Sequence, residues 1–130
     1  AGDHVRLRDS LGLLTRPVAE EIADDEREKA AWIGELRRSG LLSEGEPDTE
    51  QVITALYRFL ARTPSRLVAL ALTDAVGDRR TQNQPGTTDE HPSWRVPLTG
   101  PDGRLMLLED VFTDARAAAL CEVLRAELRP

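Results

Sequence analysis

The residues best suited to chemistry in this 130-residue chain lie together between positions 79 and 95. That segment, RRTQNQPGTTDEHPSWR, combines amides, hydroxyls, a histidine and an indole. Amides hydrogen-bond to sugar hydroxyls, and an indole face packs against the apolar C–H face of a pyranose ring. Carbohydrate binding is therefore one interpretation of the segment. The other is that Trp94 anchors a solvated loop to the core.

Other chemistries fit the segment less well. Asp89, Glu90 and His91 are adjacent, and adjacent side chains seldom converge on one ion, so we predict no metal site. Glycosidase carboxylates must flank a bond across a cleft, which neighbouring residues cannot do. His4 and His91 have no nucleophile motif near them, and the chain has neither a phosphate loop nor a dinucleotide fingerprint, so we predict no cofactor.

Composition and charge exclude several classes of protein. The chain has 17 basic and 23 acidic residues, a net charge of −6 and a pI near 4.9. Binding of the whole chain to nucleic acid or to an anionic membrane is therefore not expected. The longest apolar run, residues 67–72, is too short to span a bilayer. The single cysteine excludes an internal disulfide, and the start lacks a signal-peptide pattern, so we expect a cytoplasmic protein.

Three principal helices are predicted around the polar segment. The first spans about 17–39, begins at a proline and closes at Gly40. The second spans 49–62, behind a capping box made by Asp48 and Gln51. The third spans 113–128, with Thr113 as its N-cap and an inner stripe that includes a cysteine expected in the core: Ala117, Leu120, Cys121, Leu124 and Leu128.

The run 67–72 is apolar without a gap. It fits a strand that is buried on both faces, as in a parallel sheet, and equally a turn of buried helix, because periodicity does not separate the two. A parallel strand needs partners, and the sequence shows no other strand of this kind. The isolated chain must therefore self-associate through this run or fold it as helix.

A long loop is predicted from 77 to 104, punctuated by proline and glycine. Loops of this length are usually functional or disordered. The sequence GPDG at 100–103 favours a turn that joins a short hairpin between 95–98 and 104–107. The expected fold of the isolated chain is thus mainly α, with three helices and one long loop.

The segment 83–97, NQPGTTDEHPSWRVP, is similar to a loop near the C-terminus of bacterial 4-α-glucanotransferases, also called amylomaltases or disproportionating enzymes. That family typically reads N-x-P-G-T-x-x-E-Y/H-P-N-W-R there. Ser93 stands where the family usually has Asn, which bears on whether an amide contact is kept at that point. The flanking pattern agrees in order over nearly the whole chain: Leu11-Gly12-Leu13, Thr63-Pro64 before Leu67, and Asp74 before Gly77.

The resemblance implies an elaborated (β/α)8 barrel that transfers α-1,4-glucan segments with retention. The family uses a carboxylate nucleophile, a carboxylic acid/base and a third, stabilising aspartate in a T-H-D motif, and its pattern places all three before residue 1. Residues 1–130 would then be a single C-terminal segment of the barrel, with no catalytic residue and no activity alone. Run 67–72 would be the final strand, and the loop after it would lie where barrel active sites are found.

On this interpretation the chain's partners are maltose and maltodextrins, and five loop residues bind them. Asn83 would hydrogen-bond to hydroxyls or pin the loop, and Trp94 would stack on sugar or wedge the loop. Pro85 and Gly86 would set a turn that lets the backbone approach the sugar, next to Thr87. The alternative is a free-standing helical module whose loop binds a protein.

Overall fold

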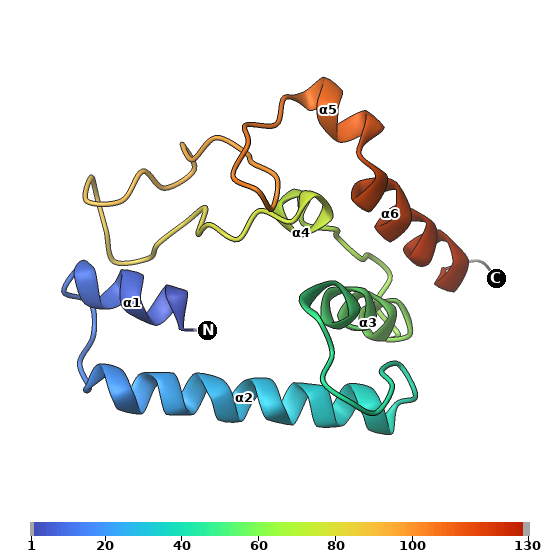
Figure 1. The fold of residues 1–130 in the computed structure, drawn as a ribbon, viewed down its shortest axis with the longest axis horizontal. Helices are drawn as coiled ribbons and strands as arrows, with labels where there is room; N and C mark the ends of the chain where they lie inside the picture. Colours follow the sequence, from blue (N-terminus) through green and yellow to red (C-terminus); the bar gives the residue numbers. More distant parts are fainter. Residues whose placement is uncertain (1, 129–130) are drawn as a thin grey trace. The chain divides into compact units, whose positions relative to one another are not determined.

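A computed structural model describes residues 2–128 of the chain. It is mainly helical, as predicted (Figure 1). The chain divides into two compact units: Ala1–Gly34 with Arg80–Val96, and Glu35–Arg79 with Pro97–Pro130. None of the helices in the described part is long and apolar enough to cross a membrane. In chain order the helices are α1 (Asp3–Ser10), α2 (Val18–Arg38), α3 (Thr49–Ala61), α4 (Leu72–Val76), α5 (Leu108–Thr113) and α6 (Ala115–Glu127).

In the first unit α1 packs against the first part of α2. Val5 of α1 is buried, and His4 lies 3.8 Å from the carboxylate of Asp25. The helix ends at Ser10, and Gly12 follows it with a φ of 67°, in the left-handed region that glycine tolerates. The sequence analysis missed α1, because its eight residues carry too few apolar side chains to show a helical period.

The acid-rich stretch of α2 lies at the surface, and its charges pair locally. Arg16 donates to Asp24 at 2.6 Å, and Lys29 donates to Asp25 at 2.8 Å. The guanidinium of Arg16 holds the pKa of Asp24 below its ordinary value. Exposed pairs of this kind add little stability, so we assign the stretch no binding role.

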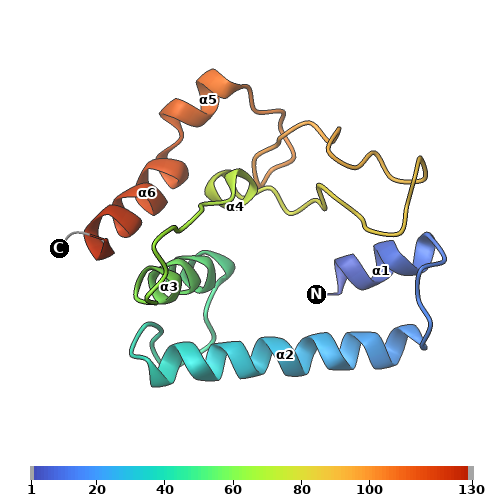
Figure 2. The same cartoon turned by 180° about the vertical axis from the view of Figure 1, so that it is seen from behind.

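In the second unit α3, α4 and α5 pack against α6 (Figure 2). The buried core cluster consists of Tyr57, Leu120 and Leu124. The phenol of Tyr57 donates to Asp74 Oδ2 at 2.7 Å and accepts from the N–H of Ala71 at 2.9 Å, which joins α3 to the start of α4. Burial raises the pKa of Tyr57, and the nearby carboxylate of Asp74 adds to the effect.

Several local signals of the sequence are confirmed. Asp48 and Gln51 form the predicted capping box of α3, with bonds of 2.8 and 2.9 Å. Gly40 closes α2 in the left-handed region with a φ of 68°. The predicted turn also forms, since the N–H of Gly103 donates to the carbonyl of Gly100 at 3.0 Å. Each of these signals depends on residues within a few positions of one another.

The predicted helix 113–128 is wrong at its start. Thr113 ends a separate helix, α5, and the N-cap of α6 is Asp114, whose carboxylate accepts from the N–H groups of Arg116 and Ala117. The backbone of Asp114 is extended, with a ψ of 126°, and this interrupts the helix. Aspartate satisfies two free amides at once, which explains why it displaces threonine as the cap.

The inner stripe of α6 is narrower than predicted. Ala117, Leu120 and Leu124 are buried, but Cys121 is exposed and Leu128 is 51% exposed. Only the side of α6 that faces its neighbours in the second unit is covered. The cysteine therefore lies at the surface and not in the core.

The predicted hairpin is reduced to one antiparallel bridge between Thr99 and Leu105, and the structure forms no strand anywhere in residues 2–128. Next to the bridge, the N–H of Met106 donates to the carbonyl of Leu98 at 2.9 Å. Pro97 has no amide hydrogen with which to extend the ladder. The backbone N–H of Arg95 donates instead to the carbonyl of Pro92 at 2.9 Å, so the expected strands do not form.

The prediction for residues 67–72 is also wrong for the isolated chain. The run is neither a buried strand nor a helix, and only Leu72 belongs to α4. Val68 and Leu70 pack against the core cluster, whereas Leu67 is 92% exposed. Burial on both faces needs a layer on each side of the run. In the second unit α3 and α6 supply one layer.

The ion pair at the ends of α3 and α6 predicts a pH dependence of stability. Arg62 donates to the two carboxylate oxygens of Glu127 at 2.9 and 3.1 Å, which lowers the pKa of Glu127 from its ordinary 4.5. A carboxylate with a lowered folded-state pKa stabilises the protein above its unfolded-state pKa, and the contribution is lost as the pH falls through the folded-state pKa. Thermal unfolding should show that Glu127→Gln loses less Tm than the wild type between about pH 5 and about pH 3. Equal losses would contradict the role of the pair.

Candidate functional site

Residues 80–95 of the polar segment form a loop within the first unit, part of the long yellow-to-orange trace that follows α4 in Figure 1. Two limbs, residues 81–84 and 91–94, are joined by three hydrogen bonds, and we call residues 81–94 the clamp loop. Nε2 of His91 donates to the carbonyl of Thr81 at 3.0 Å. The N–H of Trp94 donates to the carbonyl of Gln82 at 2.7 Å, and the N–H of Gln84 donates to Ser93 Oγ at 3.1 Å.

The tip of the clamp loop is held by its own side chains. The hydroxyl of Thr87 donates to the carbonyl of Gln84 at 2.7 Å. The carboxylate of Glu90 accepts from the N–H groups of Thr88 and Asp89 at 2.7 and 3.1 Å, and these bonds lower the pKa of Glu90. The carboxylate of Glu90 therefore closes the turn at the tip of the loop.

Gly86 lets the tip approach the segment that follows α1. Its φ is 88°, and a Cβ at this position would lie 3.2 Å from Cδ2 of Leu13. The leucine belongs to the Leu11-Gly12-Leu13 motif that the sequence analysis singled out. Leu13 of that motif therefore lies against the tip of the loop, although the two are far apart in the sequence.

Trp94 is the most unusual residue of the loop. It is 78% exposed, so within residues 2–128 it does not anchor the loop in a core. Its φ is 62°, and among residues 2–128 it is the one residue other than glycine in the left-handed region. A bulky side chain seldom adopts this conformation, and such outliers cluster at functional sites.

The other predicted site residues lie in the same loop. Asn83, Pro85 and Gly86 are exposed, and Thr87 is half-buried with its hydroxyl proton directed at Gln84. The sequence analysis missed the structural roles of His91, Ser93 and Gln84. Gln84 is buried, with 7% of its surface exposed. Spacing along the chain does not reveal which of several amides turns inward.

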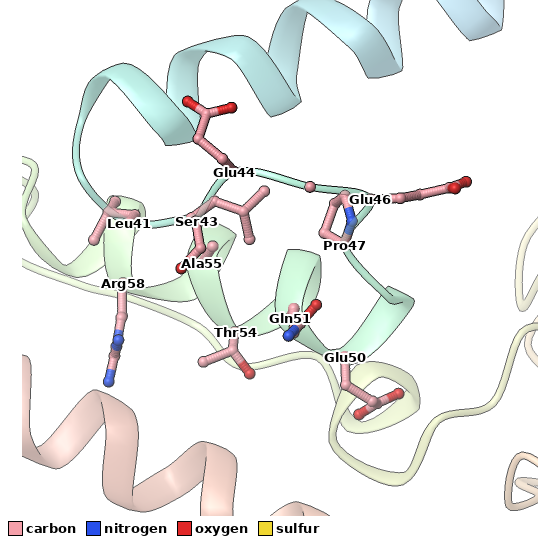
Figure 3. Close-up of a pocket in the computed structure, with 12 residues that line it drawn as sticks. Leu41, Ser43, Glu44, Glu46, Pro47, Glu50, Gln51, Thr54, Ala55 and Arg58 are labelled. Atoms are coloured by element: carbon pink, nitrogen blue, oxygen red, sulfur yellow. The ribbon is translucent and has the colours of Figure 1, made fainter.

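A separate hollow of about 370 Å³ lies in the second unit, between the connection from α2 to α3 and one face of α3 (Figure 3). The charged ends of Glu44, Glu46, Glu50 and Arg58 point away from its centre. No group of polar side chains converges there, so we do not assign it a ligand. The described residues also contain no group of three or more side chains that could hold a metal ion.

Comparison with known proteins identifies the family. The family model for 4-alpha-glucanotransferase matches residues 15–102, which include the clamp loop. The chain belongs to the 4-alpha-glucanotransferase family. It is 70% identical, over 127 residues, to the 4-alpha-glucanotransferases of Mycobacterium bovis and Mycobacterium tuberculosis strain H37Rv. These matches cover 97% of this chain and 18% of each relative.

A solved member of the 4-alpha-glucanotransferase family has a similar structure. The chain matches the crystal structure of amylomaltase from Corynebacterium glutamicum with a TM-score of 0.86 and 31% sequence identity. The match covers 95% of this chain and 19% of that one. The chain thus spans about a fifth of the length of the relatives that it matches.

Proposed function

We propose that this chain is the C-terminal part of a cytoplasmic 4-α-glucanotransferase that transfers α-1,4-glucan segments between maltodextrins with retention, and that the clamp loop lines its glucan groove. The observation that carries the proposal is the exposed indole of Trp94. The backbone of Trp94 is in the left-handed region, and its N–H donates to the carbonyl of Gln82, the residue before Asn83. An exposed aromatic face beside an exposed amide is suited to a sugar ring and its hydroxyls.

Each loop residue has a role in this proposal. Trp94 stacks on a pyranose ring, and Asn83 hydrogen-bonds to sugar hydroxyls. Pro85 and Gly86 are exposed and set the turn at the tip of the loop, which lets the backbone approach the sugar. Thr87 keeps the turn closed through Gln84, and its hydroxyl oxygen can still accept a hydrogen bond from a sugar.

Residues 67–71 support the proposal of a barrel. Val68 and Leu70 pack against the core cluster, while Leu67, Ala69 and Ala71 are exposed, which is the alternation of an extended strand. Ala71 has extended backbone angles, with φ −70° and ψ 130°. We propose that this run is the last strand of a (β/α)8 barrel. Its partner strands would be in the rest of the longer protein, and the face that is exposed here would point into the interior of the barrel.

We place the catalytic carboxylates outside this chain. In the clamp loop Glu90 accepts two backbone hydrogen bonds, and Asp89 lies at the surface 3.9 Å from Arg95. Neither is placed across a cleft from another carboxylate, as glycosyl transfer requires. The relatives extend well beyond this chain, which leaves room for a nucleophile, an acid/base and a stabilising aspartate.

This proposal predicts that the 130-residue chain alone is inactive. Incubated with maltotriose, it should release glucose and form longer dextrins no faster than a control without protein. The longer protein that contains it should form both products. Turnover by the chain alone would overturn the placement of the carboxylates. No turnover by the longer protein would overturn the proposed function.

A further inference from the structure

We propose that Ser93 is a positioning residue: its hydroxyl holds Asn83 and Trp94 together as one sugar-binding pair. The inference rests on the function proposed above. Ser93 itself contacts no substrate in this scheme. It acts through the backbone of the opposite limb, because Ser93 Oγ accepts the N–H of Gln84 at 3.1 Å.

Two hydrogen bonds between the limbs are made by the residues on either side of Asn83. Its neighbour Gln82 accepts from the N–H of Trp94 at 2.7 Å, and its other neighbour, Gln84, donates to Ser93. The residues on both sides of Asn83 are therefore fixed to the limb that carries the indole. Asn83 itself remains exposed. It lies next in sequence to both residues that bond to the opposite limb.

The hydrogen bonds between the two limbs also explain how the backbone of Trp94 keeps its conformation. A φ of 62° is unfavourable for a residue with a large side chain, and it persists only where surrounding bonds determine it. The bonds on this limb come from Trp94 N–H, Ser93 Oγ and the imidazole of His91. Loss of the Ser93 hydroxyl leaves the N–H of the buried Gln84 without this acceptor, and the left-handed turn loses one of its supports.

The resemblance to the family provides the conservative variant. The family usually has Asn at this position, and an asparagine side chain also carries an oxygen that can accept a backbone N–H. Thr keeps the hydroxyl, whereas Ala removes the acceptor. If Ser93 acts as a hydrogen-bond acceptor, the Asn and Thr variants should behave like the wild type and the Ala variant should not.

The test is steady-state kinetics of the longer enzyme with maltotriose. Ser93→Ala should raise KM about fivefold, because only a fraction of the loops presents the pair correctly, while kcat stays within about twofold. Ser93→Thr and Ser93→Asn should restore the wild-type KM. Tm should change little in all three variants, which is measured by thermal unfolding.

A matched control is Ser10→Ala in α1. The hydroxyl of Ser10 also makes one local hydrogen bond, to the carbonyl of Leu7 at 2.8 Å, but it lies outside the clamp loop. This variant should leave KM unchanged. An active wild type whose Ser93→Ala variant keeps its KM, or loses only Tm and kcat, would overturn the positioning role alone. An inactive wild type would instead overturn the proposed function.

Discussion

Replacing Trp94 with alanine should lower the kcat/KM of the longer enzyme on maltodextrins about tenfold or more and leave its Tm nearly unchanged. Trp94 is 78% exposed in this chain and would stay open to substrate in the proposed groove, so little packing is lost when the indole is removed. Substitutions at such positions usually change stability by no more than about 0.5 kcal/mol. A sugar-stacking face, in contrast, contributes on the order of 1–2 kcal/mol to binding in the transition state.

Two further variants separate stacking from backbone effects at this position. Trp94→Phe keeps an aromatic face and should retain more activity than Trp94→Ala. Trp94→Gly suits the left-handed backbone better than any other residue, so it should lose activity as alanine does without loss of stability. Asn83→Ala should also lower kcat/KM, since Asn83 is exposed and has little packing to lose. An unchanged kcat/KM in Trp94→Ala would remove the indole from the site.

Replacing Tyr57 with alanine should lower the free energy of unfolding by about 3–5 kcal/mol, the usual cost of deleting a buried aromatic ring. Tyr57 is 6% exposed and packs against Leu120 and Leu124 in the core cluster. Its hydroxyl also joins Asp74 to the N–H of Ala71, so the alanine variant loses both the packing and this connection. Urea unfolding of the chain, followed by circular dichroism, measures the effect.

Tyr57→Phe is the control for that measurement. It keeps the ring in the core and removes only the hydroxyl, so it should cost about 1–2 kcal/mol. The difference between the two variants then reports the packing of the ring itself. Equal destabilisation by both variants would contradict the role of Tyr57 as a core residue and leave only its hydrogen bonds.

The bounds of α2 and α3 could be predicted from the sequence because their causes are local. Asp48 and Gln51 are three residues apart and satisfy each other's backbone at the start of α3, whatever the rest of the chain does. Gly40 ends α2 because glycine tolerates a positive φ. The family could also be predicted, because segment 83–97 keeps a specific order of amide, proline, glycine and indole. The comparisons confirm it.

The sequence by itself thus determined the mainly helical fold, the extent of the polar loop and the family. The tertiary structure decided which side chains are covered and which amides find partners. Leu67 and Cys121 are apolar at helical or strand spacing, yet both are exposed, because burial depends on whether another element covers that face. In the sequence Gln84 and Ser93 are two polar loop residues among many, and only the structure shows that they are hydrogen-bonded to each other. Hydrogen bonds between distant limbs depend on the path of the backbone in space, and no local pattern of residues encodes that path.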